Sequence, residues 1–316
     1  MRRIMVTAAS LLGLALTSGC ALFGNPPGTG GGTADSGPLK GTSVNVASKS
    51  FTEQLVLCEI TAQRLESQGA EVERTCGMNG TNSVRAALSS GSVDMYWEYT
   101  GTGWLALEQQ GDASDPETVY RKVDAADRDR NGIVWLPPAP ANNTYALAVK
   151  KATARKLGIS TLSEYAELAR KNPSRAGFCG ASEFFGRDDG WSGLQQTYGF
   201  KLPKKHAAEL AAGPIYDAVA RANPCTFGEV FATDGRIPAL GLTVLKDDKK
   251  YFTPYNLSLN VRDAVLKKNP KVEAAMEPVS KQLTTATMQR LNAQVDVEGK
   301  RPEEVAHTWL SSHVTD

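Results

Sequence analysis

Short apolar segments alternate with amphipathic ones along most of the chain. Apolar runs bounded by Gly, Pro or polar clusters predict strands at 43–47, 70–75, 93–99, 133–136, 144–149, 177–181, 227–232 and 242–245. Apolar residues at helical spacing predict helices at about 50–68 and 83–88, from 116, at 163–170, 191–197 and 215–220, and from 262 onward. This alternation predicts an α/β fold of mostly parallel sheets with helices on both faces.

Polar and proline residues define where the predicted helices begin. Ser50 and Glu53 have the spacing of a capping box, with Ser50 as N-cap and Glu53 bonding back to it. Asp115 followed by Pro116 marks another start, because proline fits the first helical position. Gly69 and Gly91 stand where the first two helices should end.

Composition narrows the class of protein. The 316 residues carry 35 Lys and Arg against 34 Asp and Glu, with 41% hydrophobic residues. This length suits about two domains, and the balanced charge argues against a nucleic-acid partner. Only three histidines are present, and no Cys/His set has metal-ligand spacing. We therefore expect a folded, neutral protein without a metal or cofactor.

Enzyme signatures are absent from the sequence. It contains no phosphate-binding GxxxxGK[ST] loop and no HExxH, CxxC or GxSxG motif. Ser192 follows Gly190 at elbow spacing but lacks the final glycine, and the adjacent acids Asp188 and Asp189 are more typical of a helix cap. With three histidines in helical or terminal segments, a Ser/His/Asp triad is difficult to assemble. A secreted hydrolase is the alternative from a different class.

The N-terminus carries a targeting signal. In residues 1–19, Arg2 and Arg3 precede an apolar run too short to span a bilayer. The run ends in small residues before Cys20 and resembles a bacterial lipobox, although leucine stands four residues before the cysteine, not three. Residues 20–41 are rich in Gly, Pro, Thr and Ser and predict a flexible tether. We expect lipid anchoring at Cys20, outside the cytoplasmic membrane; a plain secretory signal with a chance cysteine is the alternative.

Four further cysteines fit an oxidising compartment. An even number permits two disulfides in any of three pairings, and four buried free thiols are the alternative. Cys58 lies on the first predicted helix and Cys76 ends the strand after it, so the two can approach easily. We expect the pairs Cys58–Cys76 and Cys179–Cys225.

Five segments resemble the substrate-binding proteins of osmoprotectant ABC importers, which bind glycine betaine, proline betaine, carnitine or choline. They are ASKSFTEQ at 47–54, YWEYTGT at 96–102, NNTYAL at 142–147, EFFGRDDG at 183–190 and ATDG at 232–235. The resemblance runs in order from about residue 43 to the C-terminus. It implies two α/β lobes with the ligand in the cleft between them: lobe one from 42–142 plus 251–316, and lobe two from 143–250.

The resemblance also implies an aromatic cage for a quaternary ammonium. Such a head has no N–H to donate, and ring faces attract it through their quadrupole and apolar contact. The matching positions are Tyr99, Tyr145, Phe231 and Tyr255, where Phe231 replaces the tyrosine usual in the family. Tyr216 is a further candidate, whereas Trp97 and Trp104 are expected in the core or at its rim.

The carboxylate of a betaine needs donors, and the family's positions match Lys49, Thr102 and Arg187. Lys49 precedes the first helix, and Arg187 offers a fork of N–H groups. Gln54 is an additional polar candidate, and Glu98 is expected to play a structural hydrogen-bonding role. The two cations favour a zwitterion, glycine betaine or proline betaine, over choline, which has no carboxylate. The alternative ligand is choline or carnitine. The implied protein is a monomeric receptor that delivers its ligand to a permease driven by an ATPase and performs no chemistry.

Overall fold

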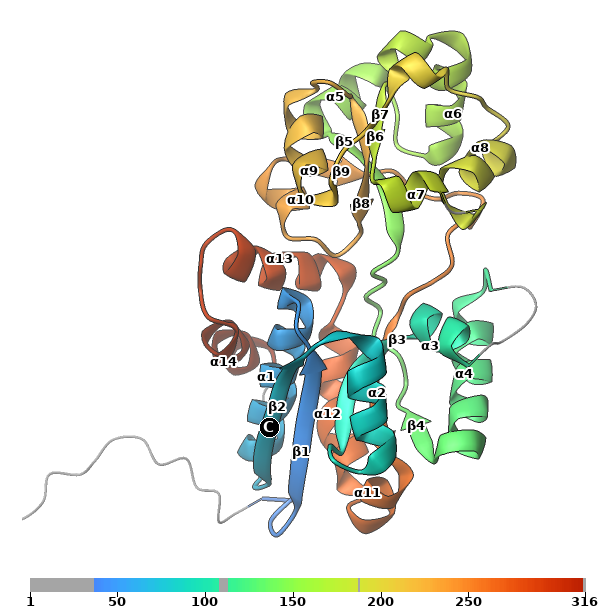
Figure 1. The fold of residues 1–316 in the computed structure, drawn as a ribbon. Coiled ribbons are helices and arrows are strands. Elements are labelled where there is room, and N and C mark those ends of the chain that lie inside the picture. The colour runs from blue at the N-terminus through green and yellow to red at the C-terminus, as the bar shows by residue number, and fades with distance from the viewer. Residues whose placement is uncertain (1–36, 108–112, 187, 315–316) are drawn as a thin grey trace, which may run out of the picture. The chain divides into compact units, whose positions relative to one another are not determined.

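The computed structural model describes residues 37–107, 113–186 and 188–314, which form two five-stranded sheets with flanking helices (Figure 1). The first sheet has the order β2-β1-β3-β10-β4 and the second has the order β7-β6-β8-β5-β9. We call the first sheet with its helices lobe one, and the second sheet with its helices lobe two. The described residues form one compact unit.

The strands of lobe one are β1 (Ser43–Lys49), β2 (Glu71–Met78), β3 (Met95–Tyr99), β4 (Ile133–Trp135) and β10 (Leu257–Arg262). Its helices are α1 (Thr52–Ser67), α2 (Gly80–Ser90), α3 (Thr100–Ala106), α4 (Pro116–Asn131), α11 (Asp263–Lys268), α12 (Lys271–Gln282), α13 (Thr285–Asp296) and α14 (Pro302–His313).

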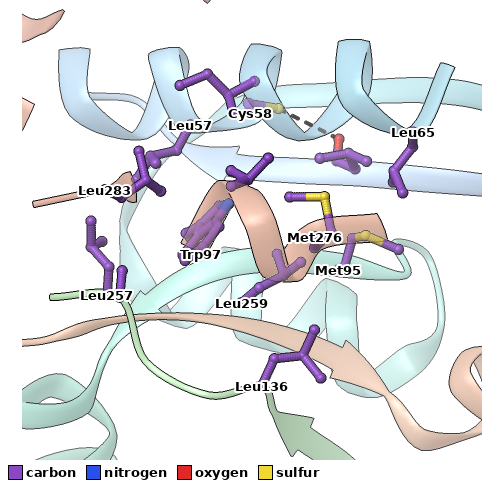
Figure 2. Packing of buried hydrophobic residues seen from close by; sticks show 14 of the residues in the cluster. Leu57, Cys58, Leu65, Met95, Trp97, Leu136, Leu257, Leu259, Met276 and Leu283 are labelled. Atoms are coloured by element: carbon purple, nitrogen blue, oxygen red, sulfur yellow. Dashed lines mark hydrogen bonds between the residues drawn. The ribbon is translucent and has the colours of Figure 1, made fainter. Parts of the chain in front are cut away.

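Strand alternation explains how helices cover both faces of the first sheet. Met95 and Trp97 of β3 enter the core built by α1, α12, α13 and α14, whereas Tyr96 between them enters the core under α2 and α4. Figure 2 shows the first of these cores, where Leu57 of α1 and Leu259 of β10 lie on either side of Trp97. Every residue of β3 is buried, so both faces of this strand lie against a core.

The strands of lobe two are β5 (Tyr145–Lys150), β6 (Phe178–Gly180), β7 (Ala207–Glu209), β8 (Phe227–Phe231) and β9 (Leu242–Val244). Its helices are α5 (Lys151–Leu157), α6 (Leu162–Lys171), α7 (Ser182–Gly186), α8 (Gly193–Tyr198), α9 (Ala212–Arg221) and α10 (Arg236–Ala239), with short turns η1 (Pro173–Arg175), η2 (Asp188–Ser192) and η3 (Lys204–His206). One face packs on α6, α7 and α8, and the other on α9 and α10.

The α/β class and the mostly parallel sheets are as the sequence predicts, with one reversed strand in each sheet, β10 in lobe one and β5 in lobe two. β1 runs parallel to β2 and β3, whereas β10 is antiparallel to β3 and β4. In lobe two, β5 is antiparallel to both neighbours, β8 and β9. The antiparallel strands β5 and β10 are the first strands after each crossing between the lobes.

The prediction of a capping box at the first helix is wrong. The N-cap of α1 is Phe51, in extended conformation, and no side chain caps this end. Glu53 is buried and directs its carboxylate to Tyr99 and Asn292 instead. In contrast, Asp115 does cap α4 by accepting a bond from the Thr118 N–H.

Two connections join the lobes, between β4 and β5 and between β9 and β10. They pair with each other, because Asn142 and Asn256 form an antiparallel bridge and Asn143 N–H donates to the Tyr255 carbonyl at 3.0 Å. The Thr144 hydroxyl also donates to the Thr253 carbonyl at 2.8 Å. The lobe boundaries expected from the sequence, at 142–143 and 250–251, fall within these two connections.

Disulfides join Cys58 to Cys76 in lobe one and Cys179 to Cys225 in lobe two. These are the two pairs expected from the sequence. The Cα atoms lie 6.2 and 5.7 Å apart, which is within the ordinary range for a disulfide. The first ties α1 to β2, and the second ties β6 to the segment before β8.

Several sequence expectations concern residues outside the described ranges. These include the signal segment at 1–19, the lipid-anchored Cys20, most of the tether, and Arg187. Among the described residues, every helix is too short or too polar to cross a bilayer. Within the same ranges, no three His, Cys, Asp or Glu side chains gather as a group that could hold a metal ion.

Candidate functional site

One small cavity collects most of the residues expected to bind a ligand. It has a volume of about 270 Å³ and is lined by Lys49, Tyr99, Thr102, Asn143, Tyr145, Glu183, Phe231 and Tyr255. Six of these are among the seven ligand-binding residues expected from the sequence, and the seventh, Arg187, lies outside the described residues. The lining residues come from both lobes and from the connections between them.

Aromatic side chains of lobe two, Tyr145 and Phe231, line one side of the cavity, which we call the aromatic wall. Tyr145 at the start of β5 lies directly opposite Phe231 at the end of β8, and their ring centroids are 5.2 Å apart. The buried ring of Phe184 on α7 lies 5.3 Å from that of Tyr145 and supports it. Phe231 is 39% exposed, so it keeps a ring surface that a ligand can contact.

Tyr255 reaches the cavity from the second connection and packs on the backbone of α3. A Cβ atom built at Gly101 would lie 2.7 Å from Tyr255 Cε2. Only glycine leaves room for the ring there. Thr102 lies in the first turn of α3 and lines the cavity together with Tyr255.

Lys49 is already paired in this structure. Its Nζ donates to Glu98 Oε1 at 2.6 Å and lies 4.9 Å from the centroid of the Tyr99 ring. Glu98 is fully buried and also accepts from the Tyr96 hydroxyl at 3.1 Å and the Tyr99 N–H at 2.8 Å. Glu98 therefore holds both Lys49 and the strand end, in the structural role expected for it.

Glu53 is the centre of a buried polar cluster behind the cavity. It accepts from the Tyr99 hydroxyl at 2.7 Å, Asn143 Nδ2 at 3.2 Å and Asn292 Nδ2 at 2.9 Å. Burial raises the pKa of the Glu53 carboxyl, against these hydrogen bonds and one with Thr233, which lower it. Burial, with the adjacent Glu53 charge, raises the pKa of Tyr99 well above its usual value, so the phenol stays protonated and donates.

The two further candidates lie behind residues that line the cavity. Gln54 is fully buried, and its Oε1 accepts from the Lys49 N–H at 3.4 Å. The Tyr216 hydroxyl accepts from the Phe231 N–H at 3.1 Å, and the ring lies under the Arg236 guanidinium at 3.9 Å. Trp97 and Trp104 belong to the two cores of lobe one.

Sequence reasoning missed two residues of the lining. Asn143 and Glu183 both face the cavity. Each lies within a segment already singled out for its resemblance, 142–147 and 183–190, so the signal was present but was not assigned to a side chain.

A second cavity of about 690 Å³ shares Asn143 and Phe231 with the first and extends along α1 and α13.

The cavity offers a small ligand aromatic ring faces, hydrogen-bond donors and contacts with both lobes. Ring faces of Tyr145, Phe231 and Tyr255 attract a cation and bury its apolar surface. Lys49 and Thr102 offer hydrogen-bond donors on the lobe-one side. Because the lining comes from both lobes, a bound ligand would contact both at once.

Comparisons with known proteins show the family of this chain. Residues 42–312 match the family described as the substrate-binding domain of ABC-type glycine betaine transport systems. The chain is 37% identical to a glycine-betaine-binding protein of Pseudomonas aeruginosa, over 88% of this chain and 90% of that one. It is 35% identical to the glycine betaine-binding protein YehZ of Escherichia coli, over 86% and 92%.

Solved structures show the same fold. Apo YehZ superposes with a TM-score of 0.78 at 32% identity, covering 85% of this chain and 98% of that one. A glycine betaine/carnitine/choline ABC transporter structure superposes with a TM-score of 0.79 at 26% identity, with the same coverage. The chain therefore belongs to the family of substrate-binding domains of ABC-type glycine betaine transport systems, which are extracytoplasmic receptors and not enzymes.

Proposed function

We propose that this protein binds glycine betaine or proline betaine outside the cytoplasmic membrane and delivers it to an ABC permease driven by a cytoplasmic ATPase. The ammonium head lies against the rings of Tyr145, Phe231 and Tyr255, and the carboxylate turns toward Lys49, Thr102 and Arg187. Binding draws the two lobes together, and the permease recognises the closed form.

The observation that supports this most is the composition of the 270 Å³ cavity. Aromatic side chains from lobe two and from the connection at Tyr255 face a lysine and a threonine of lobe one. A trimethylammonium group gains from several ring faces at once, at about 0.5–2 kcal/mol each. A carboxylate gains from charge-assisted hydrogen bonds. A small zwitterion matches both halves.

Choline or carnitine is the second candidate, and one contact favours choline. Lys49 Nζ lies 2.6 Å from the Glu98 carboxylate, so part of its charge is already compensated before any ligand arrives. The lining also includes the acidic Glu183. A ligand without a carboxylate would leave the Lys49–Glu98 pair undisturbed.

Calorimetric titration tests this function. The mature chain would be titrated in separate runs with glycine betaine, proline betaine, choline, carnitine and ectoine. The proposal expects the two betaines to bind most tightly and ectoine to bind weakly. Tighter binding of choline or carnitine would reassign the ligand, and a chain that binds none of the quaternary amines would overturn the proposed function.

We also propose that the receptor acts as a monomer anchored through lipid on Cys20. The support is the lipobox-like segment and the Gly-rich tether in the sequence. Mass spectrometry of the protein extracted from membranes should find a diacylglyceryl group on Cys20. Recovery of Cys20→Ser in the soluble fraction would agree, whereas an unmodified Cys20 in the membrane-extracted protein would contradict the anchor.

A further inference from the structure

A carboxylate lies within the aromatic core of lobe two. On β8, residues 227, 229 and 231 share one face because side chains alternate along a strand. Phe227 and Phe231 pack against the rings of Tyr165 and Tyr145 on that face. Glu229 stands between them and is only 5% exposed. Burying a carboxylate among rings is unfavourable, so its presence in this place requires a reason.

Glu229 anchors the segment that carries part of the cavity lining. Its Oε2 accepts from the Ala181 N–H at 2.7 Å, and Ala181 directly precedes α7. From α7, Glu183 lines the cavity and Phe184 packs against Tyr145. The Glu229 carboxylate therefore fixes the start of the helix that places both side chains.

Among the residues that the structure describes, few charged groups act on Glu229. From α7, the Glu183 carboxylate repels it. On the neighbouring strands, the side chains of titratable type are Cys179 on β6 and Tyr145 and Lys150 on β5. Cys179 is in a disulfide, Tyr145 lies at the cavity, and Lys150 is exposed at the far end of β5. Gly228 and Val230 face α9 on the opposite side of the sheet. Burial, with Glu183, raises the pKa of Glu229 to about 7.

Building on the proposed function, we propose that Glu229 is a positioning and specificity-determining residue for the ammonium group. Its negative charge lies behind Glu183 and adds to the attraction of the aromatic wall for a cation. Binding of an ammonium ligand then releases protons from Glu229. A cation in the cavity favours the ionised form of Glu229. Conversely, protonated Glu229 attracts the cation less. By linkage, affinity for the ammonium ligand is highest above the pKa that Glu229 has in the ligand-free protein, and it falls as the pH drops through that pKa.

The test is calorimetry with choline and with glycine betaine between about pH 5.5 and about pH 8.5, in buffers of different ionisation enthalpy. If binding lowers the pKa of Glu229 by about one unit, affinity should fall up to about tenfold toward acidic pH. Proton release should appear near neutral pH. In Glu229→Gln, which keeps an oxygen for the Ala181 N–H, both effects should disappear. Choline should lose more affinity than the zwitterion, whose carboxylate offsets the change.

Glu209→Gln is the matched control, because it removes the same charge from an exposed position on β7 of the same sheet. It should retain the pH profile of the parent, as should Glu229→Asp, which keeps the charge. A pH slope and proton release that persist in Glu229→Gln would overturn the inference. If Glu229→Gln does not fold, a parent that binds its ligand without proton release overturns it equally. A parent that binds no quaternary amine overturns the proposed function itself.

Discussion

At the scale of single residues, the rings around the cavity are held by contacts behind them. The Tyr99 hydroxyl donates to Glu53, and Lys49 Nζ lies over the Tyr99 ring at 4.9 Å. That contact uses ring surface that an ammonium ligand would otherwise contact. We therefore expect the ligand to contact Tyr145, Phe231 and Tyr255, while Tyr99 supports Lys49.

Removing one of these rings should weaken binding. Tyr145→Ala or Tyr255→Ala should weaken glycine betaine binding by about 1–3 kcal/mol through lost cation–π and apolar contact. Phe231→Tyr should preserve binding, because it keeps the ring face. Calorimetry at one pH and salt concentration measures all three. Tyr120→Ala is the control, since Tyr120 lies on α4 and donates to the Trp135 carbonyl. If Tyr145→Ala and Tyr255→Ala bind glycine betaine as tightly as Tyr120→Ala does, the two rings only pack against their neighbours and do not contact the ligand.

The expected carboxylate contact of Arg187 can be tested with the ratio of the affinities for glycine betaine and choline. If Arg187 contacts the ligand carboxylate, Arg187→Ala should cost about 2–5 kcal/mol for glycine betaine. Choline lacks the carboxylate and should lose far less. The ratio of the two affinities, measured by calorimetry for the parent and the variant, cancels general damage to the fold. An unchanged ratio would mean that Arg187 does not contact the carboxylate.

The sequence predicted which segments form the site better than it predicted what each side chain does. Six expected residues line one cavity because their segments follow strand ends or connections between lobes. The role of Glu53 was misread, because a capping box is a local pattern and the buried cluster with Asn292 depends on a contact 239 positions away. The Lys49–Glu98 pair likewise requires β1 and β3 to be neighbours, which spacing alone does not reveal.

At the scale of elements, the strands missed from the sequence are β7 and β10. β7 has only three residues, Ala207–Glu209, at the edge of the second sheet. β10 is an interior strand of the first sheet, but the sequence analysis assigned residues 257–261 to no element. Because β10 enters the first sheet from the second connection, it pairs antiparallel with β3 and makes the sheet mixed. Pattern predicts that a strand exists more readily than it predicts its direction.

One loop of lobe two packs tightly on a helix of lobe one. Gln289 and Asn292 of α13 donate to the carbonyls of Ala232 and Thr233 at 2.7 and 2.9 Å. A Cβ atom at Gly235 would lie 2.3 Å from the Ala293 backbone nitrogen. Backbone cannot yield as a flexible side chain can, so the ATDG segment requires glycine at its last position.

Gly235→Ala should therefore destabilise the protein. Overpacking of this kind costs about 1–3 kcal/mol of the free energy of unfolding. Equilibrium unfolding in urea measures the change. Gly177→Ala is the matched control in the same lobe, because the nearest heavy atom there lies 3.8 Å from the added Cβ. Equal stabilities of the two variants would show that the loop and α13 separate freely.

At the scale of the whole molecule, the paired connections and the shared cavity link the two lobes. The bridge between Asn142 and Asn256 joins one connection to the other. The cavity lining includes Lys49 and Tyr99 from lobe one and Tyr145 and Phe231 from lobe two. A ligand that contacts both walls favours the arrangement in which they face each other, which is the physical basis for closure on binding.

Ligand binding should therefore stabilise both lobes together. At a glycine betaine concentration about 100 times the Kd, binding adds about 2.7 kcal/mol to the free energy of unfolding, which should raise the Tm by about 5 °C. Because the contacts lie on both lobes, scanning calorimetry should show the whole transition moving and not one part of it. Tyr145→Ala at the same ligand concentration should show a smaller rise. Two separate transitions, of which only one moves, would mean that the ligand is held by a single lobe.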